Sequence, residues 1–299
     1  MNTDKRLNEA YDKARIEYFD DNSKYIIFSD LHRGNGSHFD EFSKNQNIFR
    51  HALEYYFENG YTYIEAGDGD ELWENPKVGD IKNAHFHIFD TIKKFNDTDR
   101  LIMIYGNHNI YMKNPEYIRE NFYTSYNEYR EMDYEFLMDL VAVEAIVLKH
   151  SETNQEILTL HGHQGDFLND QFWIPTMISL KYFWRYLHSF GIRNPASPVR
   201  NTFKRHKIER NFKKWIAKNK KMLICGHTHR FKFPREDELP YFNTGSGTYP
   251  TIITGFEISQ GRIQLIRWKV EPDSEGTLKV TRAVLRGPSP IEQFDMRFT

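Results

Sequence analysis

Cysteine is almost absent from this sequence: Cys225 is the single one among 299 residues. A lone thiol excludes an intramolecular disulfide and fits a reducing compartment. Long apolar runs are missing as well. The densely charged segment 1–24 lacks the apolar stretch of a signal peptide, and Pro175 and two cations interrupt the longest apolar and aromatic stretch, 172–190. We therefore expect a soluble, cytoplasmic protein.

A strong net charge is also absent, since the formal value is only −2. This small value hides an asymmetry: residues 193–221 contain eleven Lys or Arg and one acid, Glu209, a local net charge of +10. Hydrophobic residues make up 39% of the chain and aromatic residues 15%, which is enough for a sizeable core. The composition therefore argues against a disordered chain.

Short apolar runs typical of buried parallel strands recur along the chain, and helical patterns separate several of them. The runs are 25–28, 61–66, 101–105, 145–148, 157–160 and 222–225. The helical faces are Phe49, Leu53, Tyr56 and Phe57 before the second run, and Phe86, Phe89, Ile92 and Lys93 before the third. Alternating strands and helices predict an α/β fold with a largely parallel sheet, and ligands of such sheets gather at the carboxyl ends of the strands.

The final third of the chain changes character. Segments 241–243, 251–258, 262–270 and 278–285 have the pattern of strands joined by Gly or Pro turns, without helices between them. We expect these strands to form a second, more antiparallel sheet packed on the first. Because no repeat or linker is visible, we expect residues 1–299 to form one domain.

An insertion interrupts this pattern at about 169–221. Its first part is aromatic and its second part is basic, with Ile208, Phe212, Trp215 and Ile216 on one helical stripe. Two interpretations stay open: a solvated helix whose apolar side docks on the domain, or a cationic, partly apolar cap over an anionic substrate or against a membrane surface.

Five short motifs carry side chains that bind divalent metals, and each follows an apolar run. They are Ser29-Asp30-Leu31-His32, Gly67-Asp68, Gly106-Asn107-His108, His161-Gly162-His163 and Gly226-His227-Thr228-His229. Each motif alone is weak, because Asp-x-His and Gly-Asp are common in turns. Their conjunction at five strand ends predicts a dinuclear site for phosphate-ester hydrolysis.

Such a site needs a carboxylate that bridges two ions roughly 3.5–4 Å apart, together with separate ligands for each ion. Asp68, flanked by glycines, is the natural bridge. Asp30 and His32, two residues apart on a segment that we expect to be extended, would project to the same side. Asn107 would supply an amide oxygen.

The motif set resembles the calcineurin-like metallophosphoesterase family, whose pattern is D-x-H, G-D-x-x-[DE], G-N-H-[DE], H-G and G-H-x-H, over about residues 25–260. The resemblance implies a four-layer αββα sandwich in which two sheets lie between helices, and the helical insertion could act as a cap. It also implies two divalent ions, with manganese expected and Fe, Zn, Co or Ni as alternatives. One ion would be held by Asp30, His32, Asp68 and His229, and the other by Asp68, Asn107, His161 and His227.

Further roles follow from the same resemblance. His108 would stabilise the phosphoryl charge and protonate the leaving oxygen. The family usually follows this histidine with an acid that orients the ring, whereas this chain has Asn109. We therefore expect His108 and Asn109 to be the catalytic residues, with His108 less basic. We assign His161 as the ligand, with His163 as the alternative, and expect His163 and Arg33 to contact the substrate.

The expected function is hydrolysis of a phosphomonoester, phosphodiester or pyrophosphate by a hydroxide activated between two metals. Within the family, Gly67-Asp68-Gly69-Asp70-Glu71-Leu72-Trp73 and the aromatic-basic insert resemble the UDP-2,3-diacylglucosamine hydrolase branch. That resemblance implies an anionic amphiphile or nucleotide derivative as the substrate. A nuclease and a non-catalytic metal-binding scaffold are the alternatives, and oligomeric state is not predicted.

Overall fold

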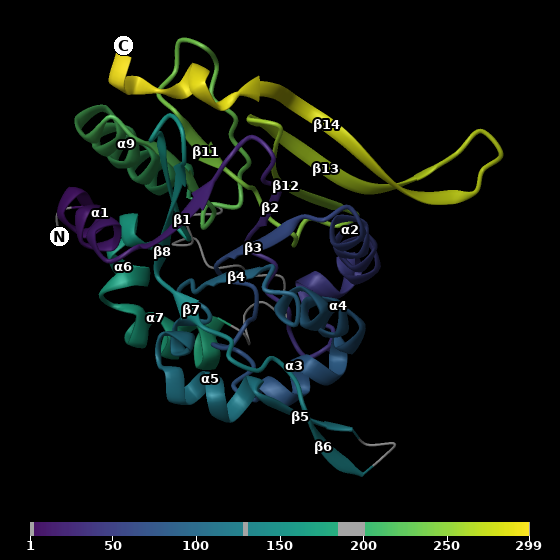
Figure 1. The fold of residues 1–299 in the computed structure, drawn as a ribbon. Helices are drawn as coiled ribbons and strands as arrows, with labels where there is room; N and C mark the ends of the chain where they lie inside the picture. Colours follow the sequence, from purple (N-terminus) through teal and green to yellow (C-terminus); the bar gives the residue numbers. More distant parts are fainter. Residues whose placement is uncertain (1–2, 128–130, 185–200, 299) are drawn as a thin grey trace.

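The computed structural model describes residues 3–127, 131–184 and 201–298 (Figure 1). Residues 185–200 of the insert therefore lie outside the described residues. Two main sheets carry the fold, with a short two-stranded hairpin beside them.

The larger sheet has seven strands in the order β14-β13-β12-β2-β3-β4-β7. Its strands are β2 (Tyr25–Phe28), β3 (Thr62–Ala66), β4 (Leu101–Ile104), β7 (Ala142–Val143), β12 (Ile252–Ser259), β13 (Arg262–Pro272) and β14 (Leu278–Pro290). The pairs from β2 to β7 are parallel, and those from β2 to β14 are antiparallel. The apolar runs 25–28, 61–66 and 101–105 therefore form the parallel strands β2, β3 and β4, in keeping with the burial of their side chains.

The smaller sheet has five strands in the order β1-β8-β9-β10-β11. They are β1 (Arg15–Phe19), β8 (Ala145–His150), β9 (Glu156–Leu160), β10 (Met222–Cys225) and β11 (Tyr241–Asn243). The expectation that strands of the final third make the second sheet is wrong. Only β11 joins the smaller sheet, because β12 pairs with β2 and carries β13 and β14 onto the edge of the larger one.

The two sheets face each other across a shared apolar layer, to which β2 contributes Ile27 and β10 contributes Ile224. Helices cover the outer face of each sheet (Figure 1). On the larger sheet these are α2 (Gln46–Glu58), α3 (Val78–Ala84), α4 (Phe86–Asn96) and α5 (Pro115–Phe122); on the smaller sheet they are α1 (Thr3–Asp12) and α9 (Thr202–Asn219). The expected four-layer sandwich is confirmed.

The insert divides into two structurally different parts. In α9 the apolar stripe Ile208, Phe212, Trp215 and Ile216 is buried against the smaller sheet, and Trp215 donates its indole N–H to Asn8 of α1 (2.7 Å). This half of the insert belongs to the body of the fold. The other half holds α6 (Phe167–Asp170), α7 (Trp173–Ser179) and η4 (Leu180–Trp184), and α7 buries none of its residues.

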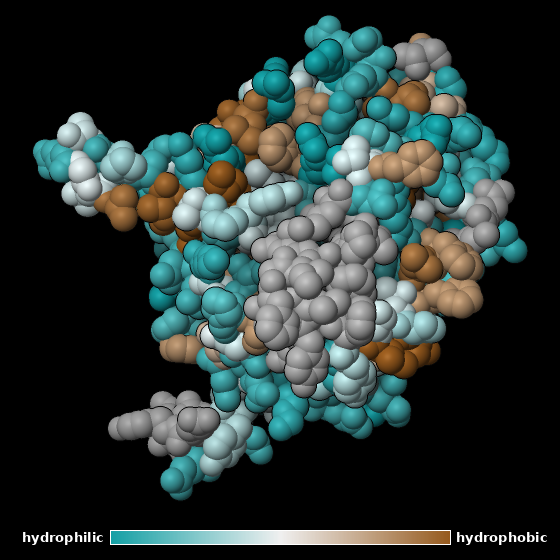
Figure 2. All heavy atoms as spheres, turned by 180° about the vertical axis from the view of Figure 1, so that it is seen from behind, coloured by the Kyte–Doolittle hydropathy of each residue, from teal (hydrophilic) through white to brown (hydrophobic). Residues whose placement is uncertain are grey.

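Two hairpins project from the body. The long ribbon of β13 and β14 extends away from the larger sheet, and the shorter one consists of β5 (Thr124–Asn127) and β6 (Met132–Glu135) (Figure 1). From behind, the tip of the long ribbon is hydrophilic, and apolar residues lie along its stem (Figure 2). Of the helices described, none has the length and apolar character needed to span a bilayer.

Candidate metal centre

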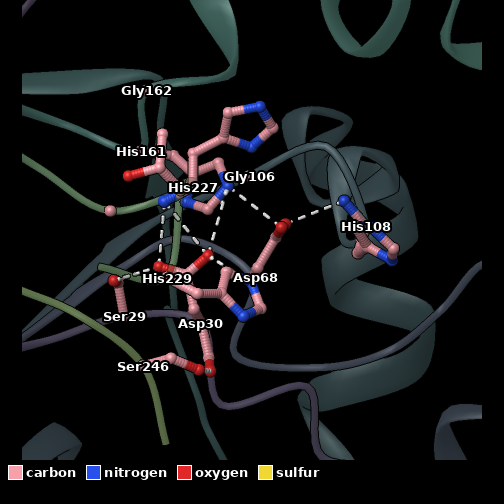
Figure 3. A network of polar contacts seen from close by, with 12 residues as sticks. Ser29, Asp30, Asp68, Gly106, His108, His161, Gly162, His227, His229 and Ser246 are labelled. Carbon is pink, nitrogen blue, oxygen red and sulfur yellow. Dashed lines mark hydrogen bonds and ion pairs between the residues drawn. The ribbon is translucent and has the colours of Figure 1, made fainter. Parts of the chain in front are cut away.

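The five motifs meet where strands of both sheets end (Figure 3). The larger sheet contributes the segments after β2, β3 and β4, and the smaller one contributes those after β9 and β10. Asp30, Asp68, Asn107, His161 and His227 are buried, whereas His32 and His229 are partly exposed. The structure therefore brings all seven expected ligands to one edge of the sandwich.

The backbone at these positions is left-handed rather than extended. The φ angles are 52° at Asp30, His32 and Asp68, 66° at His227 and 54° at His229. Such conformations are strained for residues other than glycine, by about 1–3 kcal/mol each, and gather at functional sites. The expectation that Asp30 and His32 share a side because the chain is extended is therefore wrong. Their side chains share a side because both residues, which flank the buried Leu31, have left-handed backbone angles.

Two glycines make room for the carboxylates. A Cβ on Gly106 would lie 2.2 Å from Oδ1 of Asp68, and a Cβ on Gly226 would lie 2.2 Å from Oδ2 of Asp30. No side chain can approach that closely without displacing the carboxylate. Glycine at these two strand ends is therefore a steric requirement of the site.

Asp30, His32 and His229 form the first group of candidate ligands. Nε2 of His229 lies 3.1 Å from Oδ1 of Asp30 and 3.2 Å from Nε2 of His32. The backbone amide of His227 donates to Oδ2 of Asp30 (2.9 Å). Burial by itself raises the pKa of Asp30, but His229 and His161 outweigh it and hold that pKa at about 2.

Asp68, His161 and His227 form the second group. Oδ2 of Asp68 lies 2.9 Å from Nε2 of His161 and 3.8 Å from Nε2 of His32, so this carboxylate stands between the two groups. Its other oxygen accepts the amide of His108 (2.8 Å) (Figure 3). Burial opposes ionisation of Asp68, but His161 and His108 hold its pKa well below the usual range.

The donor atoms fit divalent metal ions. Within the described residues, Oδ1 of Asn107 is buried and has no hydrogen-bond partner, as expected for an oxygen reserved for a cation. Nδ1 of His161 faces the carbonyl oxygen of Ala66 (3.1 Å), which favours a proton on Nδ1 and leaves the Nε2 lone pair toward Asp68. Nδ1 of His32 faces Glu71 in the same way (2.9 Å).

His108 is held by two residues that the sequence reasoning did not assign. Its Nδ1 lies 2.6 Å from Oε2 of Glu71, and its ring stacks on Trp73 with centroids 4.2 Å apart. Burial lowers the pKa of His108, but Glu71 and Asp68 outweigh this and raise it to about 9. The expectation of a less basic His108 is therefore wrong. Glu71 is the acid of the Gly-Asp-x-x-Glu motif. Its position in that motif could have identified it from the sequence as the partner of His108.

Asn109 does not orient the ring of His108. Its Oδ1 accepts the amide of Gly106 (2.6 Å) and lies 3.4 Å from the amide of Asp68. The side chain is buried and fixes the loop that carries Asn107 and His108. The expectation that Asn109 is a catalytic residue is therefore wrong, and its role is to hold this loop.

The two expected substrate contacts are both buried. The guanidinium of Arg33 is fully buried, with Nη1 2.7 Å from Glu65 and Nε 2.7 Å from Asp70. These two ion pairs neutralise the guanidinium, so the expectation that Arg33 contacts the substrate is wrong. His163 is buried with its ring 5.6 Å from that of His161, and desolvation holds its pKa well below the usual range. Among the described residues it belongs to none of the three groups that could hold a metal ion, the third of which is His32, Glu71 and His108.

Comparisons with known proteins agree with this geometry. A family model described as calcineurin-like phosphoesterase matches residues 23–231, which include every candidate ligand. A search of curated proteins found no match.

Two solved structures are similar to this chain. One is a Streptococcus pneumoniae TIGR4 protein described as a predicted phosphoesterase, with 14% identity, 88% of this chain and 97% of that chain covered, and a TM-score of 0.36. The other is Vps29 of Chaetomium thermophilum, with 12% identity, 88% and 96% covered, and a TM-score of 0.39.

Proposed function

The chain belongs to the calcineurin-like phosphoesterase family, and we propose that its strand-end site hydrolyses phosphate esters or anhydrides with two divalent ions bound. Membership of this family makes the chain a metal-dependent hydrolase of phosphate esters. The observation that carries the two-ion proposal is Asp68, whose carboxylate stands between the two groups of candidate ligands.

The proposed ligand sets follow the two groups. Asp30, His32, Asp68 and His229 would hold one ion, and Asp68, Asn107, His161 and His227 the other. Bound divalent ions supply Lewis-acid polarisation of a phosphoryl group and lower the pKa of water. Manganese is the metal we propose, and the mixed nitrogen and oxygen donors also suit Fe, Zn, Co or Ni.

His108 has the position and the charge to act on the substrate. Its side chain is 19% exposed while Glu71 holds Nδ1, so Nε2 is the nitrogen left for the substrate. Burial lowers the pKa of His108, but Glu71 and Asp68 raise it to about 9, which favours the protonated ring. In that form it donates to a phosphoryl oxygen and can protonate the leaving oxygen.

Two variants separate binding from chemistry. His108→Ala should retain the metal content of the wild type and lower kcat by about 10²–10⁴-fold. Asp68→Asn should reduce the metal content, because the shared ligand loses its charge. Metal analysis and a panel of p-nitrophenyl esters, cyclic nucleotides, nucleotide-sugar pyrophosphates and single-stranded nucleic acid provide the measurements. Two metals per chain in Asp68→Asn would overturn the bridging role.

The panel also distinguishes classes of substrate. The basic residues 193–221 keep a nuclease as an alternative, and a nuclease should bind nucleic acid with a steep dependence on salt concentration. A small-molecule enzyme should show no such dependence. Salt-sensitive binding together with cleavage of single strands would favour the nuclease.

A more specific candidate is a pyrophosphatase of the UDP-2,3-diacylglucosamine type, acting on an anionic amphiphile. The supporting observation is a group of apolar side chains on α6, on α7 and at the residue before α7 that are 43–50% exposed: Phe167, Leu168, Phe172, Ile174 and Ile178. Exposed apolar side chains gathered on two short helices are typical of a surface that binds an apolar ligand.

The test replaces exposed residues of α7. Deleting the whole insert would not be a clean test, because the apolar stripe of α9 is part of the core. Ile174→Ser with Ile178→Ser should raise KM for an acylated pyrophosphate substrate by about tenfold and leave a soluble phosphate ester unaffected. Phe86→Ser, at another exposed aromatic residue, is the control. Unchanged KM for the acylated substrate would reject the amphiphile.

A further inference from the structure

A basic cavity of about 400 Å³ lies between the start of α9 and the segment that follows the last histidine motif. Its lining includes Thr202, Arg205, His206 and Glu209 from α9, and Arg230 and Lys232 from the other wall. None of these residues belongs to the candidate metal ligands.

Arg205 is the unusual member of this lining. Its side chain is only 6% exposed, and among the described residues it forms no ion pair. Its guanidinium has one long hydrogen bond, to Oγ1 of Thr202 (3.5 Å). Buried cations in proteins are normally paired because desolvation is costly. An unpaired buried guanidinium in the wall of a cavity therefore indicates that an anion binds there.

Arg230 supplies a second cation across the cavity. It is exposed and forms no ion pair with a described residue, whereas Lys232 is neutralised by Glu238 (2.6 Å). Glu209 is the acid in this lining, and within the described chain it pairs with neither arginine. Two guanidinium groups with five donors each suit the oxygens of a phosphate.

Another cavity of this structure shows what a neutralised basic lining looks like. It has a volume of about 280 Å³ and is lined in part by Lys149, Lys221 and Glu156. There, Glu156 pairs with both lysines. The cavity at Arg205 has no comparable carboxylate partner among the described residues.

Each wall of the Arg205 cavity carries a residue next in sequence to one that is linked to the candidate metal centre. Arg230 directly follows His229 in the chain. On the other wall, Lys204 precedes Arg205 and reaches Oδ2 of Asp166 (2.7 Å), which lies 3.3 Å from Nε2 of His227. The cavity is therefore connected to the metal centre at both walls, through the chain at Arg230 and through the Lys204–Asp166 ion pair on the side of Arg205.

We propose that Arg205 and Arg230 form a subsite for a second phosphoryl group of the substrate. The substrate is then a phosphoester that carries two phosphoryl groups, either joined as a pyrophosphate or placed separately on the same molecule. This inference rests on the proposed function, because it names the substrate class of the same site.

The test compares matched substrates on the full-length, manganese-loaded protein. Thymidine 5′-(p-nitrophenyl phosphate) with and without a 3′-phosphate provides the separate arrangement, and a nucleoside diphosphate sugar provides the joined one. The wild type should prefer at least one two-phosphate substrate. Arg205→Gln and Arg230→Gln should each raise KM for that substrate about tenfold to hundredfold, with kcat for the one-phosphate substrate changed less than about twofold.

The matched control is Arg210→Gln, which removes an exposed guanidinium from α9 outside the cavity lining. It should leave both KM values unchanged. Arg230 is exposed, so its variant reports on the subsite even if Arg205→Gln is unstable. Equal losses on one-phosphate and two-phosphate substrates, or no preference in the wild type, would overturn the subsite.

A binding measurement separates this inference from the proposed function. Isothermal titration of the same protein with inorganic phosphate should show a binding event that Arg205→Gln loses and Arg210→Gln retains. If the wild type hydrolyses no phosphate ester but retains this binding event, the proposed function fails and the subsite stands. If hydrolysis is present and the titrations of wild type and Arg205→Gln coincide, the subsite fails alone.

Discussion

Glu71 places one carboxylate oxygen, Oε2, 2.9 Å from Nδ1 of His32 and 2.6 Å from Nδ1 of His108. One residue thus orients both a candidate metal ligand and the candidate acid. A carboxylate behind an imidazole fixes its tautomer and raises the basicity of the ring, and such partners typically matter 10–100-fold for metal affinity or activity. Burial opposes the charge of Glu71, but His108 and His32 hold its pKa at about 2.

We therefore expect Glu71→Gln to impair metal binding and turnover together. The amide keeps the shape of the side chain but removes the charge that stabilises protonated His108. Metal affinity at the site of His32 and kcat should each fall about 10–100-fold. Manganese titration and steady-state kinetics measure the two effects. Glu58→Gln, at an exposed residue ending α2, should change neither, and wild-type values in Glu71→Gln would remove its assigned role.

At the same scale, the sequence identifies residue types better than it identifies partners. Asp30, Asp68 and the histidine pairs are visible as motifs because each motif is local in the chain. The pairing of His108 with Glu71 spans 37 positions, and that of Arg33 with Glu65 spans 32. Such contacts are set by the loops after different strands. The sequence therefore suggested Asn109 as a catalytic residue and Arg33 as a substrate contact. It did not reveal that Glu71 pairs with His108 or that Glu65 pairs with Arg33.

At the scale of elements, the site depends on tight turns after parallel strands. Gly106 follows β4, and a side chain there would meet Oδ1 of Asp68 at 2.2 Å. Gly106→Ala should displace this carboxylate while the strands stay packed. We expect metal binding to fall at least tenfold, with the far-ultraviolet circular dichroism unchanged.

The control for that variant is Gly79→Ala in α3. A Cβ at Gly79 would meet no atom within 4 Å, and alanine favours a helix over glycine by about 1 kcal/mol. This control should bind metal normally and be slightly more stable. Normal metal binding in Gly106→Ala would show that the turn after β4 tolerates a side chain.

Asp166 connects α6 to the metal centre. Its Oδ1 caps the helix by accepting the amide of Leu168 (3.2 Å), and Oδ2 lies 3.3 Å from Nε2 of His227. Asp166→Asn keeps a good capping residue but removes the negative charge beside Nε2 of His227. Metal affinity of the second group should fall about 10–100-fold without loss of helix. Metal titration with circular dichroism tests this, and an equal loss of helix content would assign Asp166 to folding instead.

At the scale of the whole molecule, the four layers could be predicted because apolar runs and helical stripes are local signals. The distribution of strands between sheets could not. β12 has the same alternating pattern whether it pairs with β2 or starts a new sheet, and only its long-range antiparallel register with Tyr25, Ile26 and Ile27 decides. The position of the insert could not be predicted either, because it depends on packing. The apolar stripe by which α9 docks on the smaller sheet would equally suit a cap.

Because the candidate ligands come from both sheets, bound metal should stabilise the sandwich as a whole. Asp30, His32 and Asp68 follow strands of the larger sheet, whereas His161 and His227 follow strands of the smaller one. A ligand at a hundredfold excess over its Kd adds about 2.7 kcal/mol, and removal of the ions also leaves two buried carboxylates without their cations.

Chelation of the purified protein should therefore lower Tm by on the order of 5–10 °C, and added manganese should restore it. Differential scanning calorimetry before and after treatment gives the shift. In Asp68→Asn the shift should be smaller, because the proposed shared ligand would lose its charge. If Tm is the same with and without metal, bound ions do not stabilise the sandwich.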